Sequence, residues 1–123
     1  MTDTIFEITK TATFDAAHHM THASADARYS RLHGHSFRVE ASVRGAARAD
    51  TGWVEDFAAL DTALKAVASQ LDHGLLNEHP GLETPTLEHL CLYFAARLRP
   101  SFPTLSKIVI SRPTNGERCA LEL

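Results

Sequence analysis

The sequence has no surplus of basic residues and no long apolar run, and each absence excludes a class of protein. Twelve Lys and Arg residues stand against fifteen Asp and Glu among 123 residues, so the formal net charge is −3. This balance argues against nucleic acid or an anionic membrane surface as a partner. No apolar run approaches the roughly 20 residues that a membrane-spanning helix needs, so we expect no membrane association.

Cysteine is also scarce. Cys91 and Cys119 are the only two, and they form no recognisable disulfide framework. Residues 1–4 lack the basic start and apolar stretch of a secretory signal peptide. We therefore expect reduced thiols and a cytoplasmic location.

The residues that are present suit one globular domain. Hydrophobic residues make up 44% of the chain and charged residues 22%, which is typical of a folded protein. The length fits a single domain, residues 1–123, around one buried core. Histidine is unusually frequent, with eight in the chain, several of them clustered.

Apolar periodicity predicts four strands. In residues 36–44 apolar and polar side chains alternate, as in a half-buried strand with one face in water. Residues 4–14 show a weaker alternation, which Lys10 interrupts. Two further strands are expected at residues 108–110 and 118–123.

Two helices are expected between the second and third strands. Residues 57–71 carry an apolar stripe with steps of three and four, and Asp56 stands where an N-cap belongs. Residues 87–98 carry a similar stripe, and Pro100 stops the helix. The order is therefore β-β-α-α-β-β. We expect an α+β fold, with a four-stranded antiparallel sheet and two helices on one face.

Three histidines form a candidate metal site. His33 and His35 are two residues apart beside the second strand, so both side chains point to the same face. His18 continues the parity of the first strand and meets this pair if the two strands are neighbours. Three imidazoles leave one tetrahedral position open, as in a catalytic zinc site. His19 and His22 are alternative third ligands.

Five short segments together resemble a known family. Residues 14–18, with the sequence Phe-Asp-Ala-Ala-His, and residues 32–37, with the sequence Leu-His-Gly-His-Ser-Phe, contain the three histidines. Residues 51–57, 71–77 and 85–88 follow in the matching order. In these segments the chain resembles the 6-pyruvoyl-tetrahydropterin synthase family, which includes the 6-carboxy-tetrahydropterin synthases of queuosine biosynthesis.

The resemblance implies a fold, an assembly and a cofactor. The fold is the tunnelling fold, in which sheets of three subunits close into a barrel, so we expect a homo-oligomer, trimer or hexamer, with active sites between subunits. It implies Zn²⁺ on His18, His33 and His35 as a Lewis acid toward 7,8-dihydroneopterin triphosphate. Asp72 and His73 resemble the family's acid/base pair; the alternative is that Asp72 only orients a loop.

The residue in the position of the family's proton-transferring cysteine is Tyr29, four residues before His33. A free tyrosine has a pKa of about 10, against about 8.5 for cysteine, so its anion is scarcer at neutral pH. Tyr29 is therefore either an acid/base group or an aromatic that fills the pocket. A glutamate used by a variant branch of the family is absent too, since Ser30 stands in that position.

The substrate-binding residues also depart from the family. In our alignment Arg112 takes the position of the glutamate that anchors the pterin ring, and a guanidinium can only donate hydrogen bonds. Glu117 is a candidate substitute; otherwise the ligand presents acceptors to Arg112, or Arg112 makes only a surface ion pair. Thr86, in the segment before the second helix, is a third candidate substrate contact.

Three hypotheses for function follow. The first is a zinc-dependent lyase acting on 7,8-dihydroneopterin triphosphate or a related pterin, with a changed base. The second is a binding protein that keeps the zinc and the pocket but has lost the activity. The third is a structural oligomer in which zinc only stabilises the strand ends. The histidine triad together with Asp72 and His73 favours the first.

Overall fold

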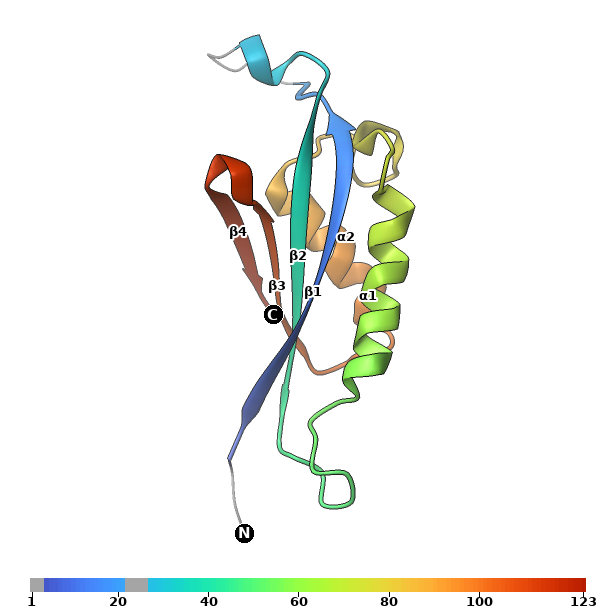
Figure 1. Ribbon diagram of the computed structural model, residues 1–123, viewed down its shortest axis with the longest axis vertical. Coiled ribbons are helices and arrows are strands. Elements are labelled where there is room, and N and C mark those ends of the chain that lie inside the picture. Colours follow the sequence, from blue (N-terminus) through green and yellow to red (C-terminus); the bar gives the residue numbers. More distant parts are fainter. Residues whose placement is uncertain (1–3, 22–26) are drawn as a thin grey trace.

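A computed structural model, which describes residues 4–21 and 27–123, shows one antiparallel sheet with two helices on one face (Figure 1). The strands lie across the sheet in chain order: β1 (Phe6–His18), β2 (His33–Gly45), β3 (Leu105–Arg112) and β4 (Glu117–Glu122). The helices are α1 (Phe57–Leu71) and α2 (Leu87–Leu98), and short 3-10 turns form η1 (Ala27–Tyr29), η2 (Leu76–Glu78) and η3 (Pro113–Asn115). The predicted element order and fold class are confirmed.

The two long strands, β1 and β2, set the register of the sheet. Phe14 pairs with Phe37, and the pairing continues to His18 opposite His33. β1 thus extends four residues beyond the expected end at residue 14, because β2 begins early enough to offer its backbone groups as partners. Both predicted metal-binding segments are therefore parts of strands rather than loops.

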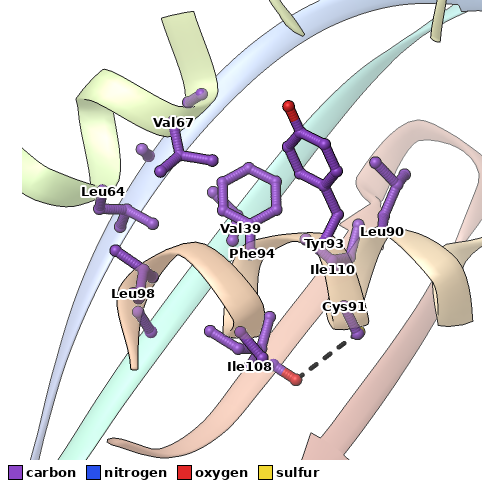
Figure 2. Close-up of a cluster of buried hydrophobic side chains, with 14 of the residues drawn as sticks. Val39, Leu64, Val67, Leu90, Cys91, Tyr93, Phe94, Leu98, Ile108 and Ile110 are labelled. Atoms are coloured by element: carbon purple, nitrogen blue, oxygen red, sulfur yellow. Dashed lines mark hydrogen bonds between the residues drawn. The ribbon is translucent and has the colours of Figure 1, made fainter. Parts of the chain in front are cut away.

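The core lies between the sheet and the two helices. Phe14 stacks on Phe37 with ring centroids 5.0 Å apart, and on Phe94 of α2 at 5.8 Å. Figure 2 shows Leu64 of α1, Phe94 and Val39 of β2 in one buried cluster. The apolar stripes predicted for both helices are confirmed as core contacts from Leu60 of α1 onward. Phe57, the first residue of the stripe predicted on α1, is 49% exposed, so its assignment to the core is wrong.

Hydrogen bonds at the helix starts agree with the sequence signals. An Asp56 carboxylate oxygen accepts from the backbone N–H of Ala58 at 2.8 Å and caps α1. Thr86 Oγ1 accepts from the backbone N–H of His89 at 3.1 Å and caps α2. Among the residues that the structure describes, no helix has the length and apolarity to cross a membrane.

Both cysteines are free, as expected. Cys91 is buried on α2, and its thiol lies 3.8 Å from the carbonyl oxygen of Ile108 (Figure 2). Burial, followed by the neighbouring Cys119, raises the pKa of Cys91 to about 12. Cys91 is therefore a protonated core residue and cannot replace the missing family cysteine.

One end of the molecule collects the segments that carry the candidate site residues. The end of β1, the start of β2, η1 and η2 lie together there, near the start of α2 (Figure 1). The opposite end holds the start of β1 and the loop before α1 (Figure 1). The functional site is therefore expected where the long strands β1 and β2 pair beyond the helices.

Candidate metal centre and its two cavities

The three predicted ligands converge on the helix-facing side of the sheet. His18 lies directly opposite His33, and His35 lies opposite Ala16, one step further along the same face. One nitrogen from each imidazole lies within 4.8 Å of the other two, which brings the three side chains to one point. The Nε2 atoms of His18 and His33 are 3.0 Å apart.

The outer nitrogens of two imidazoles are held by backbone carbonyls. His18 Nδ1 lies 3.3 Å from the oxygen of Pro85, and His33 Nδ1 lies 2.6 Å from the oxygen of Arg31. A carbonyl can only accept, so each Nδ1 carries the hydrogen. The Nε2 lone pairs of the neutral rings are therefore left pointing at the shared centre, the arrangement of metal-ligating histidines.

Burial keeps the central imidazole neutral. His18 is 1% exposed, and burial, followed by its neighbours His33 and His35, lowers its pKa to about 4. Burial, followed by the Arg112 cation, also lowers the pKa of His35. Neutral imidazole is the form that binds metal.

The donor set of this centre fits a Zn²⁺ ion. The Nε2 atoms of His18 and His33 are both acceptors and lie 3.0 Å apart, so they repel each other unless a cation or a proton lies between them.

His19, one of the two alternative third ligands, does not join this centre. The backbone N–H and carbonyl of His19 are both bonded to the Asn77 side chain, at 3.0 and 2.8 Å. His19 is not part of the histidine group that could hold a metal. His22 lies outside the described residues.

The predicted acid/base pair is formed as a direct contact. His73 Nδ1 lies 2.7 Å from one carboxylate oxygen of Asp72, and the other oxygen accepts from the backbone N–H of Asp15 at 2.8 Å. The Asp15 N–H, followed by His73, lowers the pKa of Asp72. The hydrogen bond from His73 to Asp72 raises the pKa of His73.

The segment with this pair is attached to the outer edge of β1. The backbone N–H of His73 donates to the carbonyl of Asp15 at 2.6 Å, and that of Ala17 donates to the carbonyl of Gly74 at 2.9 Å. His73 has a φ of 59°, a left-handed conformation that is uncommon for residues other than glycine. The backbone of β1 therefore holds His73 in a conformation that it would not adopt by preference.

The candidate residues are divided between two cavities. The first, of about 720 Å³, is here called the His73 cavity, and its lining includes His73, His35, Asp15, Ser36 and Asn115. The second, of about 430 Å³, is called the His18 cavity, and its lining includes His18, Tyr29, Thr86, Arg112, Glu117 and Cys119. The histidine triad contributes to both. Each cavity taken alone contains only part of the predicted site.

The wall of the His18 cavity contains an ion pair. Arg112 ends β3 and Glu117 begins β4, and the two are partners in the sheet register. Arg112 Nε lies 2.8 Å from Glu117 Oε1, and the arginine side chain is 18% exposed. The glutamate side chain is 39% exposed, so the pair is only partly buried, and it lines a cavity. The same cavity thus offers both a carboxylate and a guanidinium.

Tyr29 and Thr86 also lie where the sequence predicted a cavity. The Tyr29 side chain lines the His18 cavity and is 45% exposed, while its backbone carbonyl accepts from Met20 at 2.8 Å. The hydroxyl of Thr86 is engaged as the helix cap. Whether either residue touches a ligand stays a prediction.

Three further residues of the site escaped the sequence reasoning. Cys119 lines the same cavity as Tyr29, although it is 90 residues away along the chain. Asp15 and Ser36 face each other across β1 and β2, and the Ser36 hydroxyl donates to Asp15 Oδ1 at 2.5 Å. The strand parity that placed the histidines also predicts this second pair on the opposite face.

Comparisons with known proteins agree with the fold. The sequence profile of the 6-pyruvoyl tetrahydropterin synthase family matches residues 7–122. The solved structure of 6-pyruvoyl tetrahydropterin synthase from Caenorhabditis elegans superposes with a TM-score of 0.83 at 24% identity, covering 100% of this chain and 99% of that one. This likeness shows the fold. The chain belongs to the 6-pyruvoyl tetrahydropterin synthase family.

Two relatives extend the comparison in different directions. A dihydroneopterin monophosphate aldolase of Pyrococcus furiosus is 36% identical over 112 residues, 91% of each chain. A 6-carboxy-5,6,7,8-tetrahydropterin synthase of Synechocystis is 40% identical over 96 residues, 74% of this chain and 73% of that one. The two relatives are thus named for different reactions.

Proposed function

We propose that the protein is a zinc-dependent lyase of the 6-pyruvoyl/6-carboxy-tetrahydropterin synthase type, acting on the side chain of 7,8-dihydroneopterin triphosphate or a related pterin. The observation that carries the proposal is the convergence of His18, His33 and His35 between two cavities, one of which contains His73. A structural zinc site would not need an acid/base pair in the adjoining cavity. The relatives' activities on pterins support the same class of substrate.

Zinc on the three histidines would lower the pKa of a bound substrate hydroxyl and so favour loss of its proton. His73 would exchange a proton with the substrate side chain, and Asp72 would hold the imidazole in one orientation through Nδ1. Because Nδ1 faces Asp72, His73 Nε2 is the atom left for the substrate. In the opposite cavity Tyr29 is the candidate for the second proton transfer.

The ion pair in the His18 cavity is proposed to bind the pterin ring. The pyrimidine edge of a pterin offers N–H donors beside a carbonyl acceptor. Glu117 would accept from the donors, and the guanidinium of Arg112 could donate to the carbonyl. Thr86 is the third proposed contact, beside the N-terminus of α2. With Arg112 in the position of the family's glutamate, the ring would be held in a different geometry, but Glu117 would still supply the carboxylate that accepts from the pterin N–H groups.

The division of the residues supports a site completed by a second copy of the chain. The described residues of one chain place Tyr29 and Glu117 in one cavity and His73 in the other. A substrate bound in the His18 cavity of one subunit would meet the His73 cavity of a neighbour if the sheets join edge to edge. We therefore propose the trimer or hexamer that the family resemblance implies.

The proposal is tested by incubating the zinc-loaded protein with 7,8-dihydroneopterin triphosphate and identifying the products by mass spectrometry. We expect a 6-pyruvoyl or 6-carboxy product that disappears after chelation and in His73→Ala. The control is His89→Ala, which replaces an exposed histidine on α2 whose imidazole bonds the Thr84 carbonyl. Unchanged substrate at full zinc occupancy, with tight binding, would instead support the pterin-binding protein without activity.

A second reaction is favoured by one observation, the coverage of 91% in both chains by the Pyrococcus furiosus aldolase. An aldolase acting on this substrate breaks a carbon–carbon bond of the pterin side chain. The same incubation with dihydroneopterin monophosphate separates the two reactions. A shortened pterin side chain from the monophosphate, without elimination from the triphosphate, would identify the aldolase.

A further inference from the structure

Asp15 is the point at which β1 meets the acid/base pair. Its backbone N–H donates to Asp72 at 2.8 Å, and its backbone carbonyl accepts from His73 at 2.6 Å. Both members of the pair are thus bonded to a single residue of another element, 57 positions away from Asp72 in the sequence. A shift of Asp15 would move Asp72 and His73 together.

The side chain of Asp15 is itself fixed. Ser36 lies opposite Asp15 in the β1–β2 register, and its hydroxyl donates to Asp15 Oδ1 at 2.5 Å. A short hydrogen bond to a carboxylate is among the stronger ones in proteins. The next cross-strand pair contains Ala16 and the metal ligand His35. The contact between Asp15 and Ser36 is therefore the immediate neighbour, along the strands, of the cross-strand pair that contains a metal ligand.

We propose that Asp15 is a positioning residue for His73: its backbone anchors the Asp72–His73 pair, and its carboxylate, held by the Ser36 hydroxyl, keeps that anchor in place. The inference rests on the proposed function, because it gives His73 a chemical task. It assigns no contact with the substrate to Asp15.

The backbone of His73 indicates why such fastening is needed. Its left-handed φ of 59° is unfavourable for a residue with a side chain. The conformation persists because the hydrogen bonds to Asp15 over-determine it. The His73 side chain is 81% exposed, so little packing holds it in place. Among the described residues, the backbone hydrogen bonds to Asp15 of β1 are what restrains His73.

The carboxylate also acts on His73 through its charge. The bond to Asp72 is the main cause of the raised pKa of His73, and the charge of Asp15 adds to the same direction. Asp15→Asn keeps an oxygen that can accept from Ser36 but removes the charge. Asp15→Ala removes both. The two variants therefore separate the positional contribution from the electrostatic one.

The test follows His73 directly, by NMR titration of its imidazole in the zinc-loaded protein. In Asp15→Asn the titration midpoint should fall toward the ordinary histidine value, while the preference for hydrogen on Nδ1 in the neutral ring is kept. In Asp15→Ala and Ser36→Ala that preference should weaken, with zinc content unchanged. Thr13→Ala, on the same face of β1 two residues earlier, is the control and should alter neither.

Turnover supplies the second measurement. If the proposed reaction is found, Asp15→Ala should lower kcat on the order of tenfold with little change in KM, as expected for a residue that orients a catalytic group. An unchanged His73 titration and tautomer in Asp15→Ala would overturn the inference. So would equal effects from Asp15→Ala and Thr13→Ala, since these would indicate strand stability alone. Because the NMR readout needs no turnover, it stands even if the proposed reaction fails.

Discussion

His18 and His73 show opposite ways of tuning the same side chain. Burial lowers the pKa of His18 to about 4 and keeps it a neutral ligand. A carboxylate partner raises the pKa of the exposed His73, which favours its protonated form. The site thus combines a histidine that does not take up a proton near neutral pH with one that exchanges it readily.

Asp72→Asn should move the titration of His73. Without the carboxylate, the midpoint of the imidazole should fall toward the ordinary histidine value of about 6.5. Because the pKa of His73 is raised in the folded state, the Asp72–His73 pair contributes its full stabilisation at pH values below the ordinary histidine pKa. It is lost as pH rises through the raised pKa. NMR titration and unfolding at several pH values check this.

The outcome that contradicts this prediction is an unchanged midpoint in Asp72→Asn. The exposed His89 serves as the internal reference in the same spectra, since its imidazole bonds a carbonyl rather than a carboxylate. Its signals should be the same in both proteins.

Tyr29→Phe separates the two interpretations of the tyrosine. If the phenol transfers a proton, the loss of its hydroxyl should lower kcat by about 10²-fold or more, because a positioned acid/base group contributes that much. If the ring only fills the cavity, activity should be nearly unchanged. Cys119→Ala is the matched variant, since Cys119 supplies a thiol in the same cavity. Steady-state kinetics on the substrate found by mass spectrometry is the measurement.

The alternation of side chains along a strand determines which site residues can be predicted from the sequence. The period of two along a strand predicts that His18, His33 and His35 share one face, and the register confirms it. The pairing of Arg112 with Glu117 depended on the shape of the turn at η3, which parity does not determine. The proximity of Cys119 to Tyr29 is a long-range contact that no local pattern encodes.

The helices follow their local signals more closely than the strands. Asp56 and Thr86 cap α1 and α2 where the sequence predicts their starts. β3 is longer than the expected three residues, because Leu105 and its neighbours pair with β2 although they carry no clear alternation. Strand ends are set by the partner strand, whereas helix ends are set by residues nearby in the chain.

Thr86 offers a test at this scale, because it is both a helix cap and a proposed substrate contact. Thr86→Ala should lower the free energy of unfolding by about 1 kcal/mol through loss of the cap. Thr86→Ser keeps a capping hydroxyl and should restore most of that stability. Urea unfolding measures both variants. If Thr86→Ala leaves stability unchanged, the hydrogen bond to His89 does not cap α2.

Across the whole molecule, the sheet has two open edges. β1 and β4 are its outer strands, and the segment after α1 covers β1 only near its end. Open edges invite pairing with another strand, and closing the sheets into a barrel removes them. This architecture and the two incomplete cavities lead to the same expectation of a cyclic assembly.

Light scattering after size exclusion should therefore give a mass of three or six times that of the chain. A charged substitution on the outer edge, Ala120→Lys on β4, should reduce the mass to that of the monomer. It should also abolish activity while leaving the zinc content unchanged. A fully active monomer would contradict the composite site.

The most direct test of the account is the zinc content of the purified protein, measured by elemental analysis. The account predicts one zinc per chain in the natural sequence, and its loss in His18→Ala and in His33→Ala. His19→Ala, adjacent in sequence but outside the triad, should keep the metal. Full zinc in His18→Ala, or loss of zinc in His19→Ala, would contradict the metal centre on which the proposed chemistry depends.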